Sequence, residues 1–369
     1  MTDKLRLAVL FGGRSSEHSV SCVSAASLLA AVDRDRYDVV AVGIARDGRW
    51  VLASDDPRSL ETHGRELPSV VASGGQSVML PADPTAAGLV ALDAPHGLAA
   101  LGGIDVVFPL LHGVFGEDGT IQGLLEMAGV PYVGSGVFAS AAAMDKVHMK
   151  RLLTAAGLPV GPYVVIDDRH WRKDRAVALG RCAGLGLPVF VKPANGGSSI
   201  GITKVTDVDQ LEAAVETARH HDGKVLVEAA ISGREIECGV LEKLDGSGCE
   251  ASLPAEIRVR DDRGFYDFEA KYLDDATDLI VPADLPETVL KEIQQLALEA
   301  FDALDCAGLA RVDFFLSADG TVTINELNTM PGFTPVSMFP RMWAASGVDY
   351  PTLVDRLVQL ALNRSTPPP

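Results

Sequence analysis

Cysteine is scarce in this sequence, and long apolar runs are missing. The 369 residues hold five cysteines, scattered and without a C-x-x-C pair, which argues against a disulfide framework or a zinc site. No apolar run approaches the roughly 18 residues of a membrane span, and the apolar stretch after the charged start is too short for a signal peptide. The sequence therefore predicts a cytoplasmic protein without a membrane partner.

Basic residues are also few. There are 32 Lys and Arg against 50 Asp and Glu, a formal net charge of −18, and such a field repels nucleic acids and anionic lipids. Nucleic acid is therefore not an expected partner. Hydrophobic residues make up 47% and charged residues 22%, the balance of a folded protein. At roughly 100–200 residues per domain, the length predicts two or three domains.

Apolar runs and helical periodicities predict a chain of mixed α/β and α+β character. The N-terminal part is expected to contain strands at 5–11, 37–44, 104–110 and 130–133, and helices at 20–32 and 122–128. Between them, residues 55–100 are rich in Gly, Pro, Ala and Ser with weak periodicity, and we interpret them as a variable insertion. We expect the first domain to end near residue 134.

The rest of the chain is predicted to form an α+β unit followed by a second β-rich part. The unit is expected to comprise a helix at 139–156, strands at 163–166, 188–191, 202–205 and 224–228, and helices at 172–183 and 208–219. After it we expect strands at 234–243, 251–260, 309–316 and 321–328, an irregular stretch at 261–283, and helices at 286–304 and 349–362.

A hairpin near the C-terminus carries the most informative polar pattern. Two apolar-alternating runs flank Asp-Gly at 319–320, a strong hairpin signal. With these two as the loop residues, Asp313 lies opposite Glu326 and Arg311 opposite Asn328, all on one face. Opposed carboxylates repel unless a cation lies between them, and Asp, Glu and Asn oxygens suit Mg²⁺. The alternative is a solvated strand face that Arg311 neutralises.

A lysine next to a glycine-rich loop is the second constellation. Lys192 closes an apolar strand and is followed by Asn-Gly-Gly-Ser-Ser at 195–199. A lysine in such a place needs an anion, and a Gly/Ser loop can present several backbone N–H groups to one phosphate. The loop is not a Walker A motif. The alternative is a flexible loop with a surface-paired lysine, and Lys146, in a predicted helix, is by itself equally compatible with a solvated residue.

A glycine pattern at 134–139 offers a competing hypothesis. Gly134, Gly136 and Ala139 match G-x-G-x-x-A after a predicted strand, which favours a dinucleotide fold and a nicotinamide-dependent dehydrogenase. The expected carboxylate about 20 residues further on is missing, because residues 154–166 contain no Asp or Glu, although that motif needs it. Taken singly, Glu17, His112, Glu228 and Glu235 are compatible with capping, packing or strand-end residues.

Taken together, these motifs resemble the D-alanine–D-alanine ligases of the ATP-grasp superfamily. The resemblance extends from about residue 6 to 362, and its motifs occur in the family's order. They are Gly12-Gly13 to Glu17-His18, His112-Gly113 with Gly116 to Gly119, Met144-Asp145-Lys146, Val191-Lys192-Pro193 with Gly197 to Ser199, Glu269 to Tyr272, Arg311-x-Asp313 and Glu326-x-Asn328.

The resemblance implies a three-domain ATP-grasp fold with an N-terminal Rossmann-like domain. The implied domains are 1–134, which binds substrate, 135–229, which carries the phosphate loop, and 230–369, which carries the metal site and a mobile loop at 261–283. Family members are commonly dimers, so a homodimer is expected.

The resemblance also implies a nucleotide site and a metal site. Lys146 and Lys192 would contact the ATP phosphates, Glu228 the adenine and Glu235 the ribose. The further residues implied at ATP are Gly197, Ser198, Ser199 and Lys271. Asp313, Glu326 and Asn328 would hold two Mg²⁺ or Mn²⁺ ions.

The implied reaction joins two D-alanine molecules through a D-alanyl phosphate, with ADP and phosphate as the other products, for peptidoglycan synthesis. Glu17 would anchor the first ammonium, Arg311 and the Gly332 N–H would stabilise the oxyanion, and Lys271 with Ser337 would hold the second carboxylate. Ser198 and Tyr272 would join Glu17 in a hydrogen-bond chain that closes the loop and excludes water. His112 occupies a family position near the substrate.

The acceptor of the reaction is the main open alternative within this family. D-alanine–D-lactate and D-alanine–D-serine ligases share the same machinery, and Tyr272 in the predicted loop favours D-alanine as acceptor. A catalytically silent nucleotide-binding module is a further alternative, which the full set of Arg311, Asp313, Glu326 and Asn328 disfavours.

Overall fold

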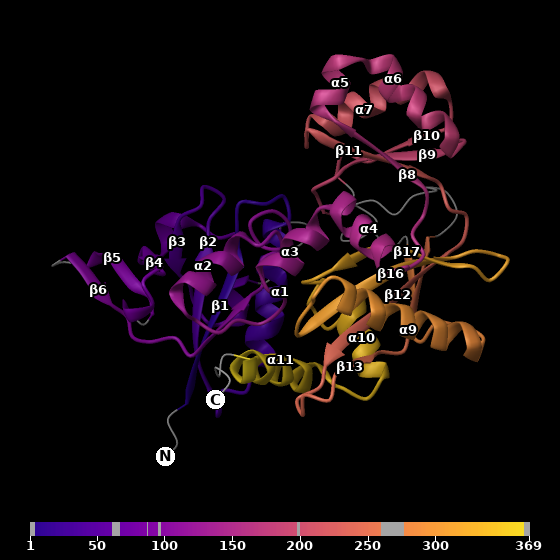
Figure 1. Cartoon of the computed structure of the whole chain (residues 1–369). Helices are drawn as coiled ribbons and strands as arrows, with labels where there is room; N and C mark the ends of the chain where they lie inside the picture. The colour runs from indigo at the N-terminus through magenta and orange to yellow at the C-terminus, as the bar shows by residue number, and fades with distance from the viewer. Residues whose placement is uncertain are drawn as a thin grey trace.

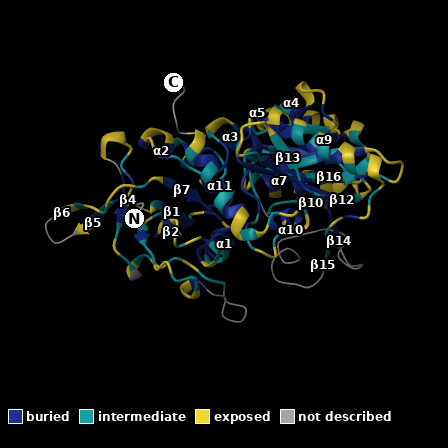
Figure 2. Ribbon diagram, turned by 90° about the horizontal axis from the view of Figure 1, so that it is seen from below, coloured by how far each residue is buried: buried dark blue, intermediate teal, exposed yellow. Residues whose placement is uncertain are grey.

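The computed structural model describes residues 4–60, 67–86, 88–94, 97–197, 200–259 and 277–364. Three large sheets and one small one account for the strands of this part of the chain. In Figure 1 the N-terminal sheet lies on the left, the C-terminal sheet on the right, and the central sheet with its helices stands above them. Figure 2 shows buried strands inside and exposed helix turns and loops outside.

The N-terminal sheet has the order β3-β2-β1-β7. Its strands are β1 (Leu5–Gly12), β2 (Tyr37–Ile44), β3 (Trp50–Leu52) and β7 (Val106–Pro109). β2 and β7 run parallel to β1, which is buried from residue 7 onward as parallel strands covered on both faces are. Helix α1 (His18–Ala31) covers one face and α2 (Thr120–Ala128) the other.

The run at 130–133 was predicted as a strand, and this prediction is wrong. It makes only an isolated parallel bridge, between Tyr132 and Val107, because the chain turns away after Val133 toward Gly134, whose φ is +98°. The dinucleotide pattern at 134–139 therefore does not follow a regular strand.

Residues 55–100 contain more order than the sequence indicated. They include a small sheet of order β4-β5-β6, with β4 at Val78–Met79, β5 at Val90–Ala94 and β6 at Gly97–Ala100. Three 3₁₀ turns accompany it at Pro57–Leu60, Ala72–Gly74 and Pro84–Ala86. Val78, Leu80 and Leu89 pack into the core of the N-terminal sheet, so this segment completes that core.

The central sheet is antiparallel and has the order β10-β9-β11-β8. Its strands are β8 (Tyr163–Asp167), β9 (Val189–Pro193), β10 (Thr203–Val205) and β11 (Lys224–Ala229). Its helices are α5 (Asp168–Lys173), α6 (Arg175–Gly180), the 3₁₀ turns Arg181–Leu185 and Val208–Gln210, and α7 (Leu211–Arg219). The predicted helix at 172–183 is thus divided, because Asp174 adopts an extended conformation between α5 and α6.

The C-terminal sheet has the order β15-β14-β12-β16-β17, with β13 also paired to β12. Its strands are β12 (Arg234–Glu242), β13 (Cys249–Ala251), β14 (Ala255–Val259), β15 (Thr277–Ile280), β16 (Leu309–Leu316) and β17 (Val322–Asn328). The predicted strand at 251–260 is two strands, and the stretch expected to be irregular includes β15. Residues 260–276 lie outside the described residues.

Helices α3, α4 and α9 pack on the core of this sheet. The predicted helix at 139–156 consists of α3 (Val137–Met144) and α4 (Lys146–Ala155), which meet at Asp145. Asp145 has φ −85° and ψ 97°, and its side chain accepts hydrogen bonds from the N–H groups of Val147 and His148. This N-cap starts α4 anew and places Lys146 at its first residue.

The C-terminal helix packs against the N-terminal part of the chain. Helix α10 (Met338–Ala345) and then α11 (Tyr350–Arg364) follow the last strand, and α11 packs against α1 and β7 of the N-terminal sheet.

The five cysteines are free, in agreement with the sequence. Within the described part of the chain, no helix is long and apolar enough to cross a membrane.

Candidate active site

A cavity of about 1010 Å³ is lined by residues of the central and C-terminal sheets, of α1 and α4, and of the loop that follows β7 of the N-terminal sheet. Every described residue that the sequence predicted for the site lines it. These are Glu17, His112, Lys146, Lys192, Gly197, Glu228, Glu235, Arg311, Asp313, Glu326, Asn328, Gly332 and Ser337. The predicted residues Ser198, Ser199, Lys271 and Tyr272 lie outside the described residues.

The hairpin places Asp313 opposite Glu326 and Arg311 opposite Asn328, as predicted, but by another route. The turn is one residue longer than expected, because Ser317 and not Ala318 pairs with Thr321, and Gly320 takes φ +88°, the usual conformation in a three-residue hairpin loop. A bulge between Asp313 and Phe314 then corrects the register. The extra residue of the bulge is Asn325, next to Glu326.

Arg311 is held between carboxylates on this hairpin face. Its Nε and Nη2 donate to the two oxygens of Asp313 at 2.7 Å each, and Nε is 3.2 Å from Oε2 of Glu237 on the neighbouring strand. Burial opposes the charge of Arg311, but Asp313 and Glu237 outweigh it and raise the guanidinium pKa well above its usual value. The Asn328 amide also donates to Asp313, at 3.1 Å. Carboxylates and a guanidinium therefore share one face, as the pattern predicted.

Three lysines line the same cavity as this face. Lys146 Nζ donates to the Gly196 carbonyl at 2.8 Å and lies 3.4 Å from Glu326. Lys192 forms an ion pair with Glu228, which also pairs with Lys150 at 2.7 Å. Burial alone would raise the pKa of Glu228, but Lys192 and Lys150 lower it to about 2.

Glu17 lies where two glycine loops meet. It is 7% exposed at the start of α1. A Cβ added to Gly113 or to Gly197 would come within 2.5 Å of its Oε2, so any other residue at either position would displace the Glu17 carboxylate. The glycine-rich loop after Lys192 thus contacts the carboxylate of the N-terminal sheet's helix.

His112 and Glu117 hold the backbone of Met330 from both sides. Glu117 accepts from the Met330 N–H at 3.2 Å and from the Gly113 N–H at 2.7 Å, while His112 Nδ1 lies 3.2 Å from the Met330 carbonyl. Burial and the nearby Glu17 raise the pKa of Glu117 to about 8, and burial lowers the pKa of His112. A neutral His112 then donates through Nδ1 and accepts from Ser24 Oγ through Nε2.

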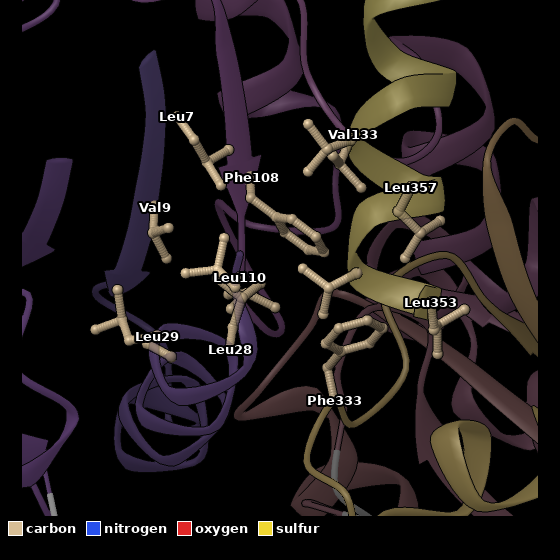
Figure 3. Packing of buried hydrophobic residues seen from close by; sticks show 14 of the residues in the cluster. Leu7, Val9, Leu28, Leu29, Phe108, Leu110, Val133, Phe333, Leu353 and Leu357 are labelled. Atoms are coloured by element: carbon tan, nitrogen blue, oxygen red, sulfur yellow. The ribbon is translucent and has the colours of Figure 1, made fainter. Parts of the chain in front are cut away.

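Phe333 fixes the segment that carries Gly332. Its ring is fully buried against Phe108, at a centroid distance of 5.4 Å, and Figure 3 shows it between the N-terminal strands and Leu353 and Leu357 of α11. Ser337, at the start of α10, lies beside Gly332, because a Cβ added to Gly332 would be 3.3 Å from the Ser337 hydroxyl.

Lys150, Glu117 and Glu237 are site residues that the sequence reasoning missed. Lys150 lies one helical turn after Lys146, and Glu237 lies two residues after Glu235 on a predicted strand, so periodicity was a usable signal for both. Glu117 lies within the family motif at 116–119, but that motif does not indicate its contact with Met330, which is distant in the sequence.

The fold and the cavity define an ATP-grasp protein. Two antiparallel sheets, one with lysines and a glycine-rich loop and the other with a carboxylate-bearing hairpin, enclose one cleft next to an α/β domain. Among the described residues, no group of three His, Cys, Asp or Glu side chains is arranged to hold a metal ion. The hairpin offers two carboxylates and an amide instead.

Comparisons with known proteins specify the family. The model for the D-ala D-ala ligase N-terminus matches residues 6–135, and that for the C-terminus matches residues 152–359. The chain is 61% identical to a D-alanine--D-alanine ligase of Frankia casuarinae, covering 98% of this chain and 97% of the relative, and 58% identical to one of Mycobacterium bovis, covering 98% and 96%. This chain therefore belongs to the D-alanine–D-alanine ligase family.

Solved structures agree with this assignment. The VanG D-Ala:D-Ser ligase from Enterococcus faecalis superimposes with a TM-score of 0.83 at 32% identity, over 97% of this chain and all of that one. The D-alanine-D-alanine ligase from Coxiella burnetii gives 0.82 at 35% identity, over 99% and 95%. The dehydrogenase hypothesis from residues 134–139 finds no support in these relatives.

Proposed function

We propose that this chain joins two D-alanine molecules to D-alanyl-D-alanine at the expense of ATP, in the cytoplasm and for peptidoglycan synthesis. The observation that carries the proposal is one cavity lined both by lysines and hairpin carboxylates and by Glu17, Gly332 and Ser337. A carboxylate oxygen of the first D-alanine attacks the γ-phosphorus, and the bond to ADP breaks. The amine of the second D-alanine then attacks the acyl carbon, loses a proton, and expels phosphate.

The nucleotide is proposed to lie along the lysines. Lys146 and Lys192 neutralise the phosphates, Glu228 accepts from the adenine amino group, and Glu235 binds the ribose. Gly197 permits close approach of the loop that includes Ser198 and Ser199, and Lys271 reaches the nucleotide from the segment at 261–283. In such a transfer, catalysis is mainly positioning and charge neutralisation.

The hairpin face fits a divalent metal. Asp313, Glu326 and Asn328 present hard oxygen donors side by side, the ligand type of Mg²⁺ and Mn²⁺. We propose that these residues hold two such ions. When bound, the ions supply further neutralisation of the phosphate charge.

The first D-alanine is proposed to lie against Glu17, which attracts its ammonium group. Arg311 and the Gly332 N–H stabilise the oxyanion that develops when the second amine attacks. Ser337 and Lys271 hold the second carboxylate, and Ser198 and Tyr272 complete a hydrogen-bond chain with Glu17. His112 supports this substrate side, where its ring holds Met330.

The larger organisation is also proposed. Residues 1–134, 135–229 and 230–369 act as three domains around the cleft, and two chains form a homodimer. Size-exclusion chromatography with light scattering would measure the mass, and a particle of one chain's mass would contradict the dimer.

Identifying the product tests the reaction. The purified protein, ATP and Mg²⁺ are incubated with D-alanine alone or with equimolar D-serine or D-lactate, and the products are identified by mass. We expect D-alanyl-D-alanine to dominate in every mixture. L-alanine is the matched control and should give no product.

A D-serine acceptor is the second candidate, because the VanG D-Ala:D-Ser ligase is similar over its whole length. Preferential incorporation of D-serine would support that candidate and reject D-alanine as the acceptor.

Tyr272→Phe should move preference toward D-lactate, and an unchanged preference would exclude Tyr272 as the determinant.

A further inference from the structure

Lys150 is a buried lysine to which neither the proposed reaction nor the sequence motifs give a role. It lies on α4, one turn after Lys146, and is only 2% exposed. Its ammonium group contacts Glu228 Oε1 at 2.7 Å and donates to the Asn325 carbonyl at 3.2 Å. These contacts hold Lys150 in the wall of the cavity. Through them Lys150 joins the segment of Glu228 to the segment of Asn325.

The two partners of Lys150 belong to different sheets. Glu228 is on β11 of the central sheet, and Asn325 is the bulge residue on β17 of the C-terminal sheet. A bulge leaves its extra residue outside the ladder, and here the carbonyl of that residue is bound by Lys150. The bulge also sets the register of Glu326, so Lys150 contacts the feature that positions this carboxylate.

The charges show why this lysine can be removed without leaving an isolated charge. Glu228 pairs with both Lys150 and Lys192, and burial lowers the pKa of Lys150 while Glu228 raises it. Without Lys150, Glu228 and Lys192 remain as a balanced pair. Without Glu228, two buried lysines would lose their shared carboxylate, which is the costlier change.

We propose that Lys150 is a positioning residue that ties Glu228, at the adenine end of the cleft, to the bulge beside Glu326, at the metal end. The tie holds the two ends at one spacing, the spacing that a nucleotide with its metal has to match. The inference rests on the proposed function for the roles of Glu228 and Glu326, but the tie itself does not.

Hydrogen exchange of the ligand-free protein tests the tie directly. In Lys150→Met, which keeps the length of the side chain and removes its charge, we expect faster exchange in peptides covering both β11 and β17. Lys291→Met is the matched control, because Lys291 is exposed on α9 and pairs only with the nearby Glu287 among the described contacts. Faster exchange confined to α4, or none, would overturn the proposal.

Binding measurements test the consequence for the site. In Lys150→Met we expect the metal-free dissociation constant for ADP to rise about tenfold, because Glu228 is no longer held in place and one charged hydrogen bond to the nucleotide is lost. Mn²⁺ binding should weaken as well. The KM for D-alanine should stay within about twofold of the unchanged protein, because no tie to the D-alanine side is lost. Lower thermal stability with unchanged ADP and Mn²⁺ binding would reduce Lys150 to a scaffold residue and overturn the inference.

A double-mutant cycle separates positioning from direct contact with the nucleotide. If Lys150 acts through Glu228, the loss of ADP affinity in Lys150→Met with Glu228→Gln should be smaller than the product of the two single losses. Losses that multiply would mean that Lys150 acts independently of Glu228 and would overturn the proposal. If Lys150→Met shows the exchange effect but the unchanged protein binds no ADP, the proposed function fails while the tie stands.

Discussion

The two sides of the cleft balance their charges differently. On the side that we propose for the nucleotide, the nucleotide side, each ammonium group has a carboxylate within 3.4 Å. This side is defined by Lys146, Lys150, Lys192, Glu228 and Glu326. The side that we propose for D-alanine, the substrate side, is formed by Glu17, His112, Glu117 and the segment at 330–337. There Glu117 accepts from two backbone N–H groups and His112 contacts the Met330 carbonyl, and Glu117 experiences the charge of Glu17.

This difference indicates which charge of ligand each side can bind. Ion pairs already hold these lysines in place inside the protein. Their charge can therefore stabilise phosphates without a further cost of desolvation. Two neighbouring carboxyl groups gain from an incoming ammonium group, which is what an amino acid supplies. The same cleft thus has one side suited to an anion and another suited to a cation.

Removing a hairpin carboxylate should have the largest effect. We expect Glu326→Ala to lower metal-dependent turnover by more than about 100-fold, since even residues that only support metal ligands cost 10–100-fold. Phosphate release measures turnover, and circular dichroism should show that the fold is retained. Near-normal turnover would refute the metal assignment and the nucleotide side with it.

Charge removal on either side should separate the two substrates. We expect Lys192→Met to raise the KM for ATP about 10- to 100-fold and Glu17→Gln to raise that for D-alanine by a similar factor, since each loses charge-assisted hydrogen bonds. Each variant should leave the KM of the other substrate nearly unchanged. Equal effects of one variant on both substrates would break the division into two sides.

The two sides should also respond oppositely to pH. The folded-state pKa of Glu228 is lowered to about 2, so its stabilisation is present above the ordinary value of 4.5 and is lost as pH falls below it. The folded-state pKa of Glu117 is raised to about 8, so its protonated form favours folding at low pH and this contribution is lost as pH rises from 4.5 to 8. Melting temperatures of Glu117→Gln, relative to the unchanged protein, should therefore improve as pH rises through this range. A constant difference across the range would contradict the raised pKa.

A contact outside the cleft should have the smallest effect. The Tyr37 hydroxyl donates to Asp355 on α11 at 2.6 Å and accepts from Gln359 at 2.8 Å. We expect Tyr37→Phe to cost about 1 kcal/mol of unfolding free energy and to change neither KM. Denaturant unfolding measures the free energy of unfolding. A changed KM for either substrate would mean that this contact on α11 also affects the cleft.

The hairpin shows how far the sequence could be interpreted. Alternation of apolar residues correctly predicted that Arg311, Asp313, Glu326 and Asn328 share a face, although both the turn length and the uninterrupted ladder were wrong. The two errors cancelled, because the longer turn shifts the register by one residue and the bulge at Asn325 shifts it back. The bulge has a trace in the sequence that the prediction did not use, because the buried apolar residues Val322, Ile324 and Leu327 change spacing from two to three across it.

Contacts between distant segments were beyond the local patterns. Lys150 could have been found from its spacing to Lys146, but the helix was predicted without the break at Asp145 that starts α4. Nothing near Glu117 indicates that it binds Met330, and the run at 130–133 is apolar enough for a strand yet makes only a bridge. Tertiary packing decided each of these.

The ratio of phosphate to dipeptide, measured in one reaction, tests most directly the claim that both sides of the cleft act together. The account predicts one phosphate for each D-alanyl-D-alanine formed and almost none when D-alanine is left out. Phosphate release that is independent of D-alanine, or that yields no dipeptide, would contradict it.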